Sequence, residues 1–327
     1  MVTGLVDISS QVDAGLLPAL NAMPPAAYDA SDLHAVVALM RARAVERLAR
    51  MPLPALPPSV AVRDQFVPGP AGAPEVLVRT YRPAGLRTGA PAFYWIHGGG
   101  MVLGNVAGSD AYCAGLAEAL GVLVASVEYR LAPEHPFPAP LEDCYAGLRW
   151  LVGAADELGI NGGRIAIGGG SAGGGLAAGL ALLARDRGEV RICFQLLVYP
   201  MIDDRSATAS SHAILDARVW NRTSNLAGWD AYLAGRAGNA DVSIYAAPAR
   251  ATELAGLPPA YINVGTLDLF VDEDIAYAQA LTRAGVPVEL HVYPGAFHGA
   301  PNLAPGAALS QRWLADERAA LHRALNG

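Results

Sequence analysis

Residues 164–188 read RIAIGGGSAGGGLAAGLALLARDRG, and this stretch decides the fold. An isoleucine-containing run at 164–167 enters the motif GGSAG at 169–173 and leaves it as an Ala/Leu-rich helix. A hydroxyl presented on so sharp a strand–turn–helix junction requires a strained backbone, and small flanking residues let the strand and the helix approach each other closely. The pattern therefore predicts a G-x-S-x-G nucleophile elbow with Ser171 at its tip and a helix N-terminus beneath it.

The same glycines also satisfy the dinucleotide-binding pattern G-x-G-x-x-G, through Gly168, Gly170 and Gly173. That fingerprint occurs early in its fold and needs an acidic residue about 20 positions on, at the end of the next strand. Here the motif follows the fifth predicted strand, and the next strand ends in Tyr199-Pro200 without such an acid. A glycine-rich helix-packing turn is the third interpretation of this segment taken alone, and the nucleophile is favoured over both.

Short β-rich runs alternate with helical stretches on both sides of the elbow. The first two predicted strands form an antiparallel pair, and most of the other six are near-continuous apolar runs, which are typical of a parallel sheet covered on both faces. The predicted strands are 60–67, 75–83, 93–96, 122–129, 164–167, 192–199, 260–264 and 288–293, and the predicted helices are 109–120, 139–158, 172–187, 271–284 and 307–325. The alternation predicts an α/β fold with an eight-stranded, mostly parallel sheet flanked by helices.

Two further segments fall outside this alternation. Residues 31–50 carry apolar side chains at helical spacing, and four prolines within 52–58 end the predicted helix. About 60 residues separate Tyr199 from Ala260, which is too long for an ordinary connection and predicts an insertion, with helical periodicity at 212–234.

A discontinuous organisation follows from these two segments. We expect residues 1–55 and 203–240 to form a helical cap, and residues 56–202 and 241–327 to form one core that carries it.

Composition restricts the partner of this 327-residue chain. All 23 basic residues are Arg, and 30 acidic residues bring the formal net charge to −7, so a phosphate-neutralising face for nucleic acid is not expected. A composition that is 53% hydrophobic and 16% charged indicates a folded chain, and we expect a neutral small-molecule partner. Neither a signal-peptide pattern nor an uninterrupted apolar run of about 20 residues is present, so a soluble, cytoplasmic protein is expected.

The cysteine spacing and the lack of metal-binding motifs indicate a protein without disulfides, metals or cofactors. Cys113, Cys144 and Cys193 are an odd number at unpatterned spacing, which favours reduced thiols over a disulfide framework or a metal site. No HExxH helix and no acidic cation loop occurs, and we expect neither a metal nor an organic cofactor.

A second glycine cluster, His97-Gly98-Gly99-Gly100, follows the third predicted strand. Consecutive glycines allow backbone N–H groups to point into a cavity, which is the arrangement that stabilises a tetrahedral oxyanion. A flexible turn is the plainer interpretation. Because this cluster and Ser171 both follow parallel strands, however, the two loops are expected to meet at the carboxyl edge of the sheet.

A serine nucleophile needs a base and an acid that orients the base. Of the seven histidines, His298 stands in a loop just after the last predicted strand, where it can reach the edge of the sheet. Asp268 comes immediately after the preceding strand, whereas the three acids at 272–274 begin a helix and are expected to act as dipole partners. The order Ser171, Asp268, His298 is that of an acyl-transfer triad.

With these residues in place, the sequence resembles the bacterial hormone-sensitive-lipase-like carboxylesterases, family IV esterases of the α/β-hydrolase fold. The resemblance covers residues 60–300. It is carried by HGGG at 97–100, EYRLAPEHPFPAPLED at 128–143, the elbow at 169–173, the Asp268 turn with Asp272-Glu273, and FHG at 297–299.

The resemblance implies a role for each matching residue. Ser171 would be the nucleophile, His298 the base and Asp268 its orienting acid. The oxyanion hole would be made by backbone amides of the triplet Gly98, Gly99 and Gly100, above all the last two, together with that of Ala172. His97 would shape the loop without transferring protons.

The activity implied by the resemblance is hydrolysis of short- to medium-chain acyl esters through an acyl-enzyme, with a helical cap lining the acyl pocket. Homodimers are common in the family, and the predicted strand 288–293 offers an edge for pairing. Cleavage of amides, lactones or carbonates on the same triad stays open, as does a non-catalytic small-molecule receptor on the same fold.

The sequence departs from the family at Gly170, where Asp is usual, and at Leu269, where Pro is common. Loss of the Asp puts the rigidity of the elbow in question. In the insertion, Trp220, Trp229 and Tyr232 are expected either to contact the acyl chain or to pack the cap on the core.

Overall fold

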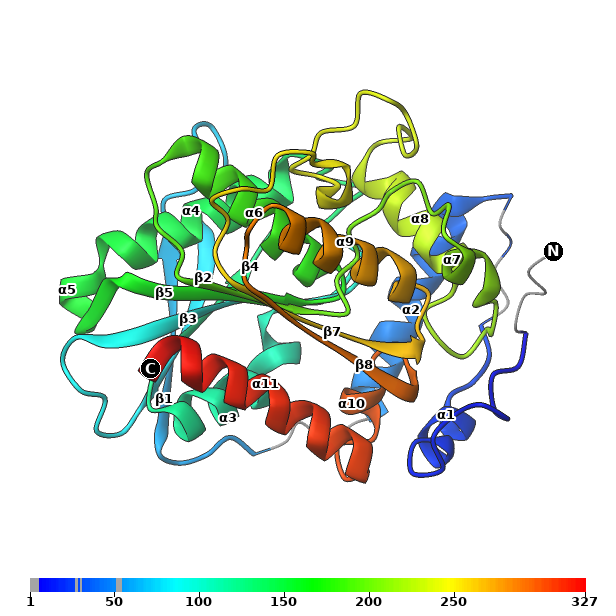
Figure 1. Cartoon of the computed structure of the whole chain (residues 1–327), viewed down its shortest axis with the longest axis horizontal. Coiled ribbons are helices and arrows are strands. Elements are labelled where there is room, and N and C mark those ends of the chain that lie inside the picture. Colours follow the sequence, from blue (N-terminus) through cyan, green and yellow to red (C-terminus); the bar gives the residue numbers. More distant parts are fainter. Residues whose placement is uncertain (1–5, 27–28, 30, 51–54) are drawn as a thin grey trace.

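An eight-stranded sheet runs through the middle of the molecule, as Figure 1 shows for the computed structural model, which describes residues 6–26, 29, 31–50 and 55–327. The strands are β1 (Val60–Val67), β2 (Val76–Pro83), β3 (Ala90–Ile96), β4 (Leu123–Glu128), β5 (Ile160–Gly170), β6 (Phe194–Val198), β7 (Ala260–Leu267) and β8 (Val288–Phe297). Their order in the sheet is β1-β2-β4-β3-β5-β6-β7-β8. The pairs β1–β2 and β2–β4 are antiparallel and all others are parallel, which confirms the predicted fold class.

Helices cover both faces of the sheet (Figure 1). They are α1 (Leu17–Ala22), α2 (Leu33–Arg50), α3 (Asp110–Leu120), α4 (Ala139–Gly153), α5 (Ala155–Leu158), α6 (Ala172–Arg187), α7 (Ala209–Ala213), α8 (Arg222–Tyr232), α9 (Val271–Arg283), α10 (Ala300–Leu303) and α11 (Ala308–Asn326). Short 3₁₀ turns lie at η1 (Val106–Ser109) and η2 (Pro248–Arg250). Helices α4, α6 and α9 lie on one side of the sheet and α3 and α11 on the other.

The helical predictions need two corrections. The single helix predicted over 139–158 is broken at Ala154, whose φ of −90° and ψ of 9° leave the helical region just after Gly153, a weak helix former. The helical insertion predicted over 212–234 consists of the short helix α7 and the longer α8, with a loop between them.

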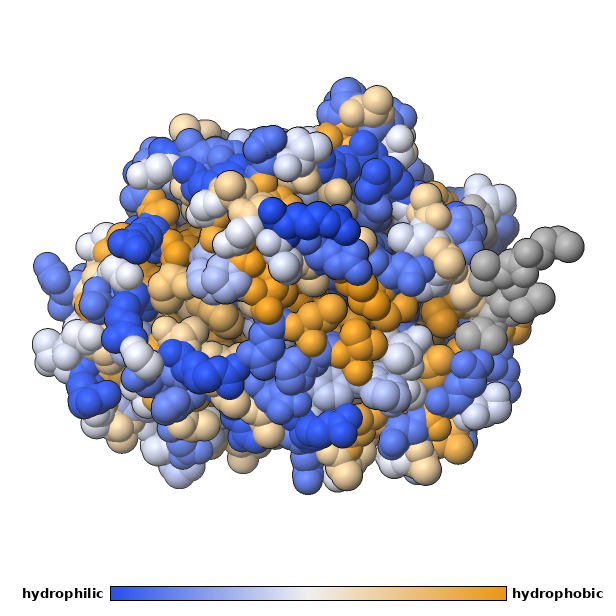
Figure 2. Space-filling view, in the orientation of Figure 1, coloured by the Kyte–Doolittle hydropathy of each residue, from blue (hydrophilic) through white to orange (hydrophobic). Residues whose placement is uncertain are grey.

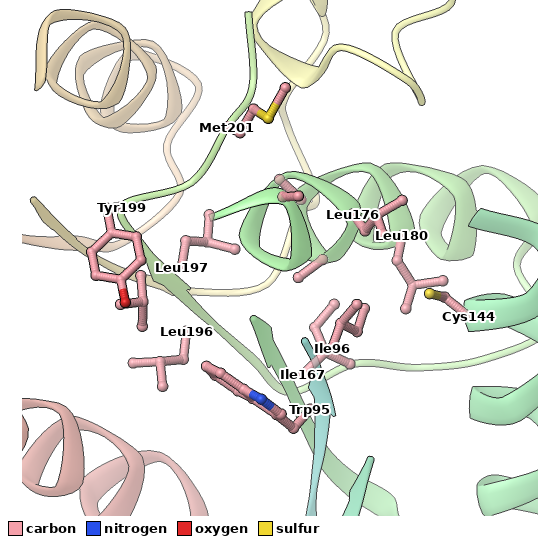
Figure 3. Close-up of a cluster of buried hydrophobic side chains, with 14 of the residues drawn as sticks. Trp95, Ile96, Cys144, Ile167, Leu176, Leu180, Leu196, Leu197, Tyr199 and Met201 are labelled. Carbon is pink, nitrogen blue, oxygen red and sulfur yellow. The ribbon is translucent and has the colours of Figure 1, made fainter. Parts of the chain in front are cut away.

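The central strands are buried on both faces. Every residue of β3 and of β6 is buried, which is the physical reason for their largely apolar sequences, although β6 also contains the buried Gln195. Figure 3 shows side chains of these strands, of β5 and of α6 packed together. Among them are Ile96, Ile167 and Leu197 from the strands and Leu176 and Leu180 from the helix. The core thus lies directly beneath the turn that carries Ser171.

The N-terminal segment, residues 6–50 as far as described, packs against the insertion, residues 203–240. Figure 1 shows α1 and α2 at the same end of the molecule as α7 and α8, and α2 packs on α8. The buried face of α2 carries Val36, Val37 and Met40. Backbone bonds join the segments as well, since the Ala26 N–H donates to the Ala217 carbonyl at 2.7 Å.

Within the described part of the chain, no helix combines the length and the apolar character needed to span a bilayer.

Candidate active site

Ser171 lies at the junction of β5 and α6 in a conformation that non-glycine residues rarely adopt. Its φ is 57° and its ψ is −121°, which costs on the order of 1–3 kcal/mol. Three backbone hydrogen bonds hold it there. The Ser171 N–H donates to the Val198 carbonyl at 2.9 Å, and the Ser171 carbonyl accepts from the N–H groups of Gly175 and Met201, each at 3.0 Å. The predicted elbow is therefore present.

Glycines let the elbow touch the neighbouring glycine cluster. A Cβ atom at Gly173 would lie 2.1 Å from the Ile96 carbonyl oxygen and 2.5 Å from that of His97. A Cβ atom at Gly98 would lie 2.6 Å from the Gly170 carbonyl oxygen and 3.3 Å from Ser171 Cβ. The two loops are thus in backbone contact, which explains why glycine is needed on both sides.

Two alanine substitutions in the elbow should differ sharply in stability. Gly173→Ala forces a methyl group against backbone carbonyls that cannot move independently, and we expect a loss of at least about 3 kcal/mol in the free energy of unfolding. Gly170→Ala is the matched control. Its methyl group would meet Trp95 and Tyr199 rings no closer than 3.7 Å, so the change should stay within about 1 kcal/mol. Urea denaturation measures both values, and equal stabilities would contradict the close approach.

The structure brings Ser171, His298 and Asp268 together in one line of hydrogen bonds. His298 Nε2 lies 2.9 Å from Ser171 Oγ, and His298 Nδ1 lies 2.7 Å from Asp268 Oδ2. With its proton on Nδ1, the imidazole donates to Asp268 and accepts from the Ser171 hydroxyl. The three residues come from the ends of β5, β7 and β8, as predicted, and only 11% of the His298 side chain is exposed.

The imidazole is also held by aromatic packing that the sequence did not reveal. The centroid of the His298 ring lies 4.6 Å from that of Tyr199 and 5.2 Å from that of Phe270, both in edge-on geometry. Asp268 is fixed through its other oxygen, since Oδ1 accepts the Phe270 N–H at 3.1 Å. Tyr199 has a φ of 36°, so its unusual backbone turns the ring toward the site.

The three acids that follow Asp268 do not contact His298. They lie in the first turn of α9, as predicted, but two of them are buried. Glu273 Oε1 accepts the N–H groups of Ile202 and Asp203 at 2.9 and 3.1 Å, whereas Asp272 accepts the Ser210 N–H at 2.7 Å. Burial raises the pKa of Glu273 and of Asp274 well above the ordinary carboxyl range. These residues therefore do more than complement the helix dipole.

The segment from Gly98 to Val102, called here the oxyanion loop, has an unusual backbone. Gly99, Gly100 and Met101 have φ values of 127°, 61° and 65°. The Gly99 carbonyl accepts the Val102 N–H at 3.1 Å, and the Met101 carbonyl accepts the Ala132 N–H at 2.9 Å. Since C=O and N–H point in opposite directions across a trans peptide, fixing the carbonyls also fixes where the N–H groups point.

Three amide groups remain available beside Ser171. Over the ranges that the structure describes, the N–H groups of Gly99 and Gly100 have no hydrogen-bond acceptor. Ala172 is the first residue of α6, where N–H groups lack an intrahelical acceptor. These are the amides that the resemblance implied for an oxyanion hole.

His97 is buried under the oxyanion loop and does not reach Ser171. Its ring stacks on Tyr129 with centroids 4.2 Å apart, and its Nδ1 lies 2.9 Å from the Gly98 carbonyl oxygen. Burial lowers the pKa of His97 to about 4, so the ring is neutral at pH 7 and donates from Nδ1. A Cβ atom at Gly104 would lie 2.7 Å from this nitrogen, which explains the glycine there.

The lowered pKa makes folding stability depend on pH. His97 titrates near 6.5 when unfolded and at about 4 when folded. The unfolded chain therefore binds the extra proton first, and stability falls by up to about 3 kcal/mol as pH drops from 6.5 to 4. His97→Asn keeps a donor near the position of Nδ1 but does not titrate. Urea denaturation at several pH values should give a shallower acid decline for the variant, and parallel curves would contradict the prediction.

The aromatic side chains of the insertion lie in two different places. Trp229 and Tyr232 are fully buried and pack the insertion. Trp220 lies at the site, because a Cβ atom at Gly100 would approach its Cη2 to 2.2 Å and its ring centroid is 6.4 Å from that of His298.

The three cysteines are free, with Cys113 and Cys144 buried and Cys193 half-buried. Within the described ranges, no group of three or more His, Cys, Asp or Glu side chains is arranged to hold a metal ion.

Comparison with known proteins shows which family this chain resembles. Residues 93–302 match the protein family described as the alpha/beta hydrolase fold. Carboxylesterase NlhH of Mycobacterium tuberculosis is 39% identical over 291 residues, covering 86% of this chain and 89% of the relative. Ethyl acetate hydrolase of Pseudomonas putida is 34% identical over 229 residues, or 68% of this chain and 70% of that enzyme.

A solved structure agrees over almost the whole chain. A bacterial heroin esterase superimposes with a TM-score of 0.88 and 44% identity, covering 98% of this chain and 99% of the esterase. The family matched, the sequence relatives and the solved structure together show that this chain belongs to the α/β-hydrolase family, among bacterial esterases.

Proposed function

We propose that this protein is a serine carboxylesterase whose catalytic residues are Ser171, His298 and Asp268. The observation that supports this most directly is the unbroken line from Ser171 Oγ through the imidazole to Asp268, with gaps of 2.9 and 2.7 Å. A triad aligned at hydrogen-bond distance is ready for proton transfer. A receptor that had lost catalysis would not need this alignment.

The mechanism follows from the positions of the protons. His298 Nε2 removes the hydroxyl proton of Ser171 as Oγ attacks the ester carbonyl, and Asp268 stabilises the resulting imidazolium. The imidazolium then gives that proton to the departing alcohol, leaving an acyl-enzyme. A water molecule attacks the acyl-enzyme in the same way, His298 again moves the proton, and the acid is released.

The tetrahedral intermediates carry a negative oxygen that must be stabilised. We assign this role to the amides of Gly99, Gly100 and Ala172, with Gly98 providing the close approach to Ser171. The oxyanion loop and the start of α6 supply these donors from two separate segments of the chain. The donors are fixed before the substrate arrives, so no reorganisation is needed when the charge develops.

The N-terminal segment and the insertion together form the proposed cap, corresponding to residues 1–55 and 203–240. Packing of α2 on α8 supports the view that the two segments form one structural unit. Trp220, which belongs to this unit, lies next to Gly100 of the oxyanion loop. The core proposed to carry the cap comprises residues 56–202 and 241–327. In this arrangement the cap supplies a wall of the substrate site and the core supplies the reacting groups.

Short- to medium-chain acyl esters are the proposed substrates. Trp220 narrows the space next to the oxyanion loop, and the name of the Pseudomonas putida relative refers to an acetyl ester. For p-nitrophenyl esters of two to sixteen acyl carbons, we expect kcat/KM to be highest at short to medium lengths. It should fall by about tenfold or more for the longest chains, because Trp220 restricts the space beside the oxyanion loop.

Two outcomes of this series would contradict the proposed substrate class. A rate that rises steadily toward sixteen carbons would indicate a long-chain enzyme. The absence of any hydrolysis by well-folded protein would favour a receptor.

A homodimer is proposed through the exposed edge of β8. This strand ends the sheet, and Figure 2 shows apolar side chains on the face where β7 and β8 lie. Val292 of β8 is 36% exposed, although it is a large apolar residue. An unpaired strand edge can pair with a second copy. Light scattering during gel filtration tests this proposal, and the mass of a single chain at high concentration would refute it.

A cytoplasmic location is proposed from the cysteines, because unpaired, buried thiols suit a reducing compartment. Fractionation of cells that express the full chain tests it, with recovery outside the cytoplasm as the contrary result.

A further inference from the structure

Arg41, in α2 of the N-terminal segment, reaches across to the oxyanion loop. Its Nε donates to the Val102 carbonyl at 2.8 Å, and its Nη2 donates to the Ala132 carbonyl at 2.7 Å. The same guanidinium contacts Glu134 through both carboxylate oxygens, at 2.6 and 2.8 Å. One side chain from outside the core thus bonds two separate stretches of core backbone.

The two carbonyls belong to segments that already support each other. The Ala132 N–H donates to the Met101 carbonyl, so Ala132 is bonded to the oxyanion loop on one side and to Arg41 on the other. Val102 is fully buried and directly follows the run of positive φ values from Gly99 to Met101. A buried carbonyl needs a donor, and within the described chain Arg41 is the donor for that of Val102.

The loop needs this support because it has little regular structure of its own. Between β3 and η1 the backbone is neither helix nor strand, and Met101 has a φ of 65°, which is unfavourable for a residue other than glycine. Such a conformation persists only when surrounding contacts determine it. His97 fixes the start of the loop through the Gly98 carbonyl, and Arg41 fixes its end through the Val102 carbonyl.

We infer that Arg41 is a positioning residue that holds the oxyanion loop in its catalytic geometry and thereby makes this geometry depend on docking of the N-terminal segment. The inference rests on the proposed function, because it requires that Gly99 and Gly100 bind the oxyanion. Arg41 itself has no hydrogen bond to Ser171, His298 or Asp268. It acts through the peptide units between Val102 and Gly99.

The carbonyl contacts, rather than the ion pair, carry this role. Glu134 is 56% exposed and the Arg41 side chain 33%, and exposed pairs of this kind contribute about 0–1 kcal/mol. The planar guanidinium donates to the two carbonyls from two different nitrogens, Nε and Nη2, whereas the single nitrogen of an ammonium group would have to lie within reach of both carbonyls. Neither carbonyl contact involves a Glu134 atom.

Three variants of the full-length enzyme test the inference. Arg41→Met keeps the apolar stem and removes all donors, Arg41→Lys keeps the charge without the planar fork, and Glu134→Gln weakens the ion pair while leaving the carbonyl contacts. For Arg41→Met we expect kcat on p-nitrophenyl acetate to fall by about 10- to 100-fold with KM nearly unchanged. Arg41→Lys should lie between Arg41→Met and wild type, and Glu134→Gln should stay within about twofold of wild type.

A second measurement separates positioning from general destabilisation. A trifluoromethyl ketone forms a hemiketal with Ser171 whose oxyanion requires the hole, whereas the matching secondary alcohol binds without one. In Arg41→Met the affinity for the ketone should fall by the same factor as kcat, while the affinity for the alcohol stays unchanged. Circular dichroism at the assay temperature verifies that the variant is folded.

The contrary outcomes are distinct. Wild-type kcat in Arg41→Met, equal loss of affinity for the alcohol and the ketone, or an equal loss in Glu134→Gln would each overturn the role of the carbonyl contacts. A wild-type enzyme that hydrolyses the ester but is not inhibited by the ketone would overturn the proposed oxyanion hole, and the inference with it. Retention of activity by Ser171→Ala would instead refute the proposed mechanism itself.

Discussion

Replacing Ser171 by Ala should lower kcat for p-nitrophenyl acetate by about 10⁶-fold, the size of the loss found when the serine nucleophile of a catalytic triad is removed. Without Oγ no acyl-enzyme can form, and His298 has no hydroxyl proton to remove. The amides beside the site still stabilise charge, so a residual rate above that in water is expected. Initial rates and the amplitude of the p-nitrophenol burst measure the loss, because the burst reports formation of the acyl-enzyme.

The control for this substitution is another buried serine of the same sheet. Ser126 lies in β4 and is fully buried, so Ser126→Ala changes a comparable side chain outside the site and should leave kcat unchanged. A phosphonate ester should label the wild-type protein at Ser171 and leave the Ser171→Ala variant unlabelled, as mass spectrometry of peptides would show. Wild-type turnover in the purified variant would refute the assignment of Ser171.

The fold was predictable wherever one element carries its own signal. β3 and β6 are buried on both faces, so their sequences are apolar apart from Gln195, and helices of three or more turns have a full hydrophobic period. The short helices α1, α7 and α10 were not predicted with their observed bounds. Helices of four to six residues cannot show periodicity, and they form because tertiary packing holds them.

The site residues were predictable for a similar reason. Ser171 and the glycine cluster lie within local motifs, and Asp268 and His298 each follow a parallel strand closely. Tyr199, Phe270 and Arg41 were missed because their importance depends on contacts with residues far away in the sequence. The sequence indicates Trp220 as a residue of the insertion but not its place in the structure, because only the packing of the insertion brings it to Gly100.

The departure from the family at Gly170 also has a structural explanation. Rigidity of the elbow was in question because a side chain that hydrogen-bonds is missing at this position. The Ser171 backbone, however, is held by three hydrogen bonds that involve no side chain at residue 170. The space around Gly170 would admit a Cβ atom without a close contact. We therefore expect the loop to keep its shape without the missing side chain.

Asp268→Asn should cause the second large loss, about 10⁴-fold in kcat near neutral pH. Asp268 Oδ2 accepts a hydrogen bond from the N–H group at His298 Nδ1, 2.7 Å away, and so keeps that proton on Nδ1 and leaves Nε2 free to accept the Ser171 proton. An asparagine amide group at the position of Oδ2 donates instead of accepting, which favours the opposite tautomer with its proton on Nε2. That imidazole cannot act as the base. The geometry is kept, so KM and thermal stability should change far less than kcat.

The neighbouring carboxylate of Asp272 provides the control for Asp268→Asn. Asp272→Asn removes a charge four positions away, but Asp272 accepts its hydrogen bond from the Ser210 N–H and not from His298, so kcat should remain within about threefold of wild type. The assignment of Asp268 would be wrong if Asp268→Asn kept more than about a tenth of the wild-type kcat while Asp272→Asn lost most of its activity. Because Asp268 and Asp272 carry the same formal charge and lie at the same end of α9, a loss confined to Asp268→Asn would trace the effect to the hydrogen bond with Nδ1, not to the electrostatic field of the acidic cluster.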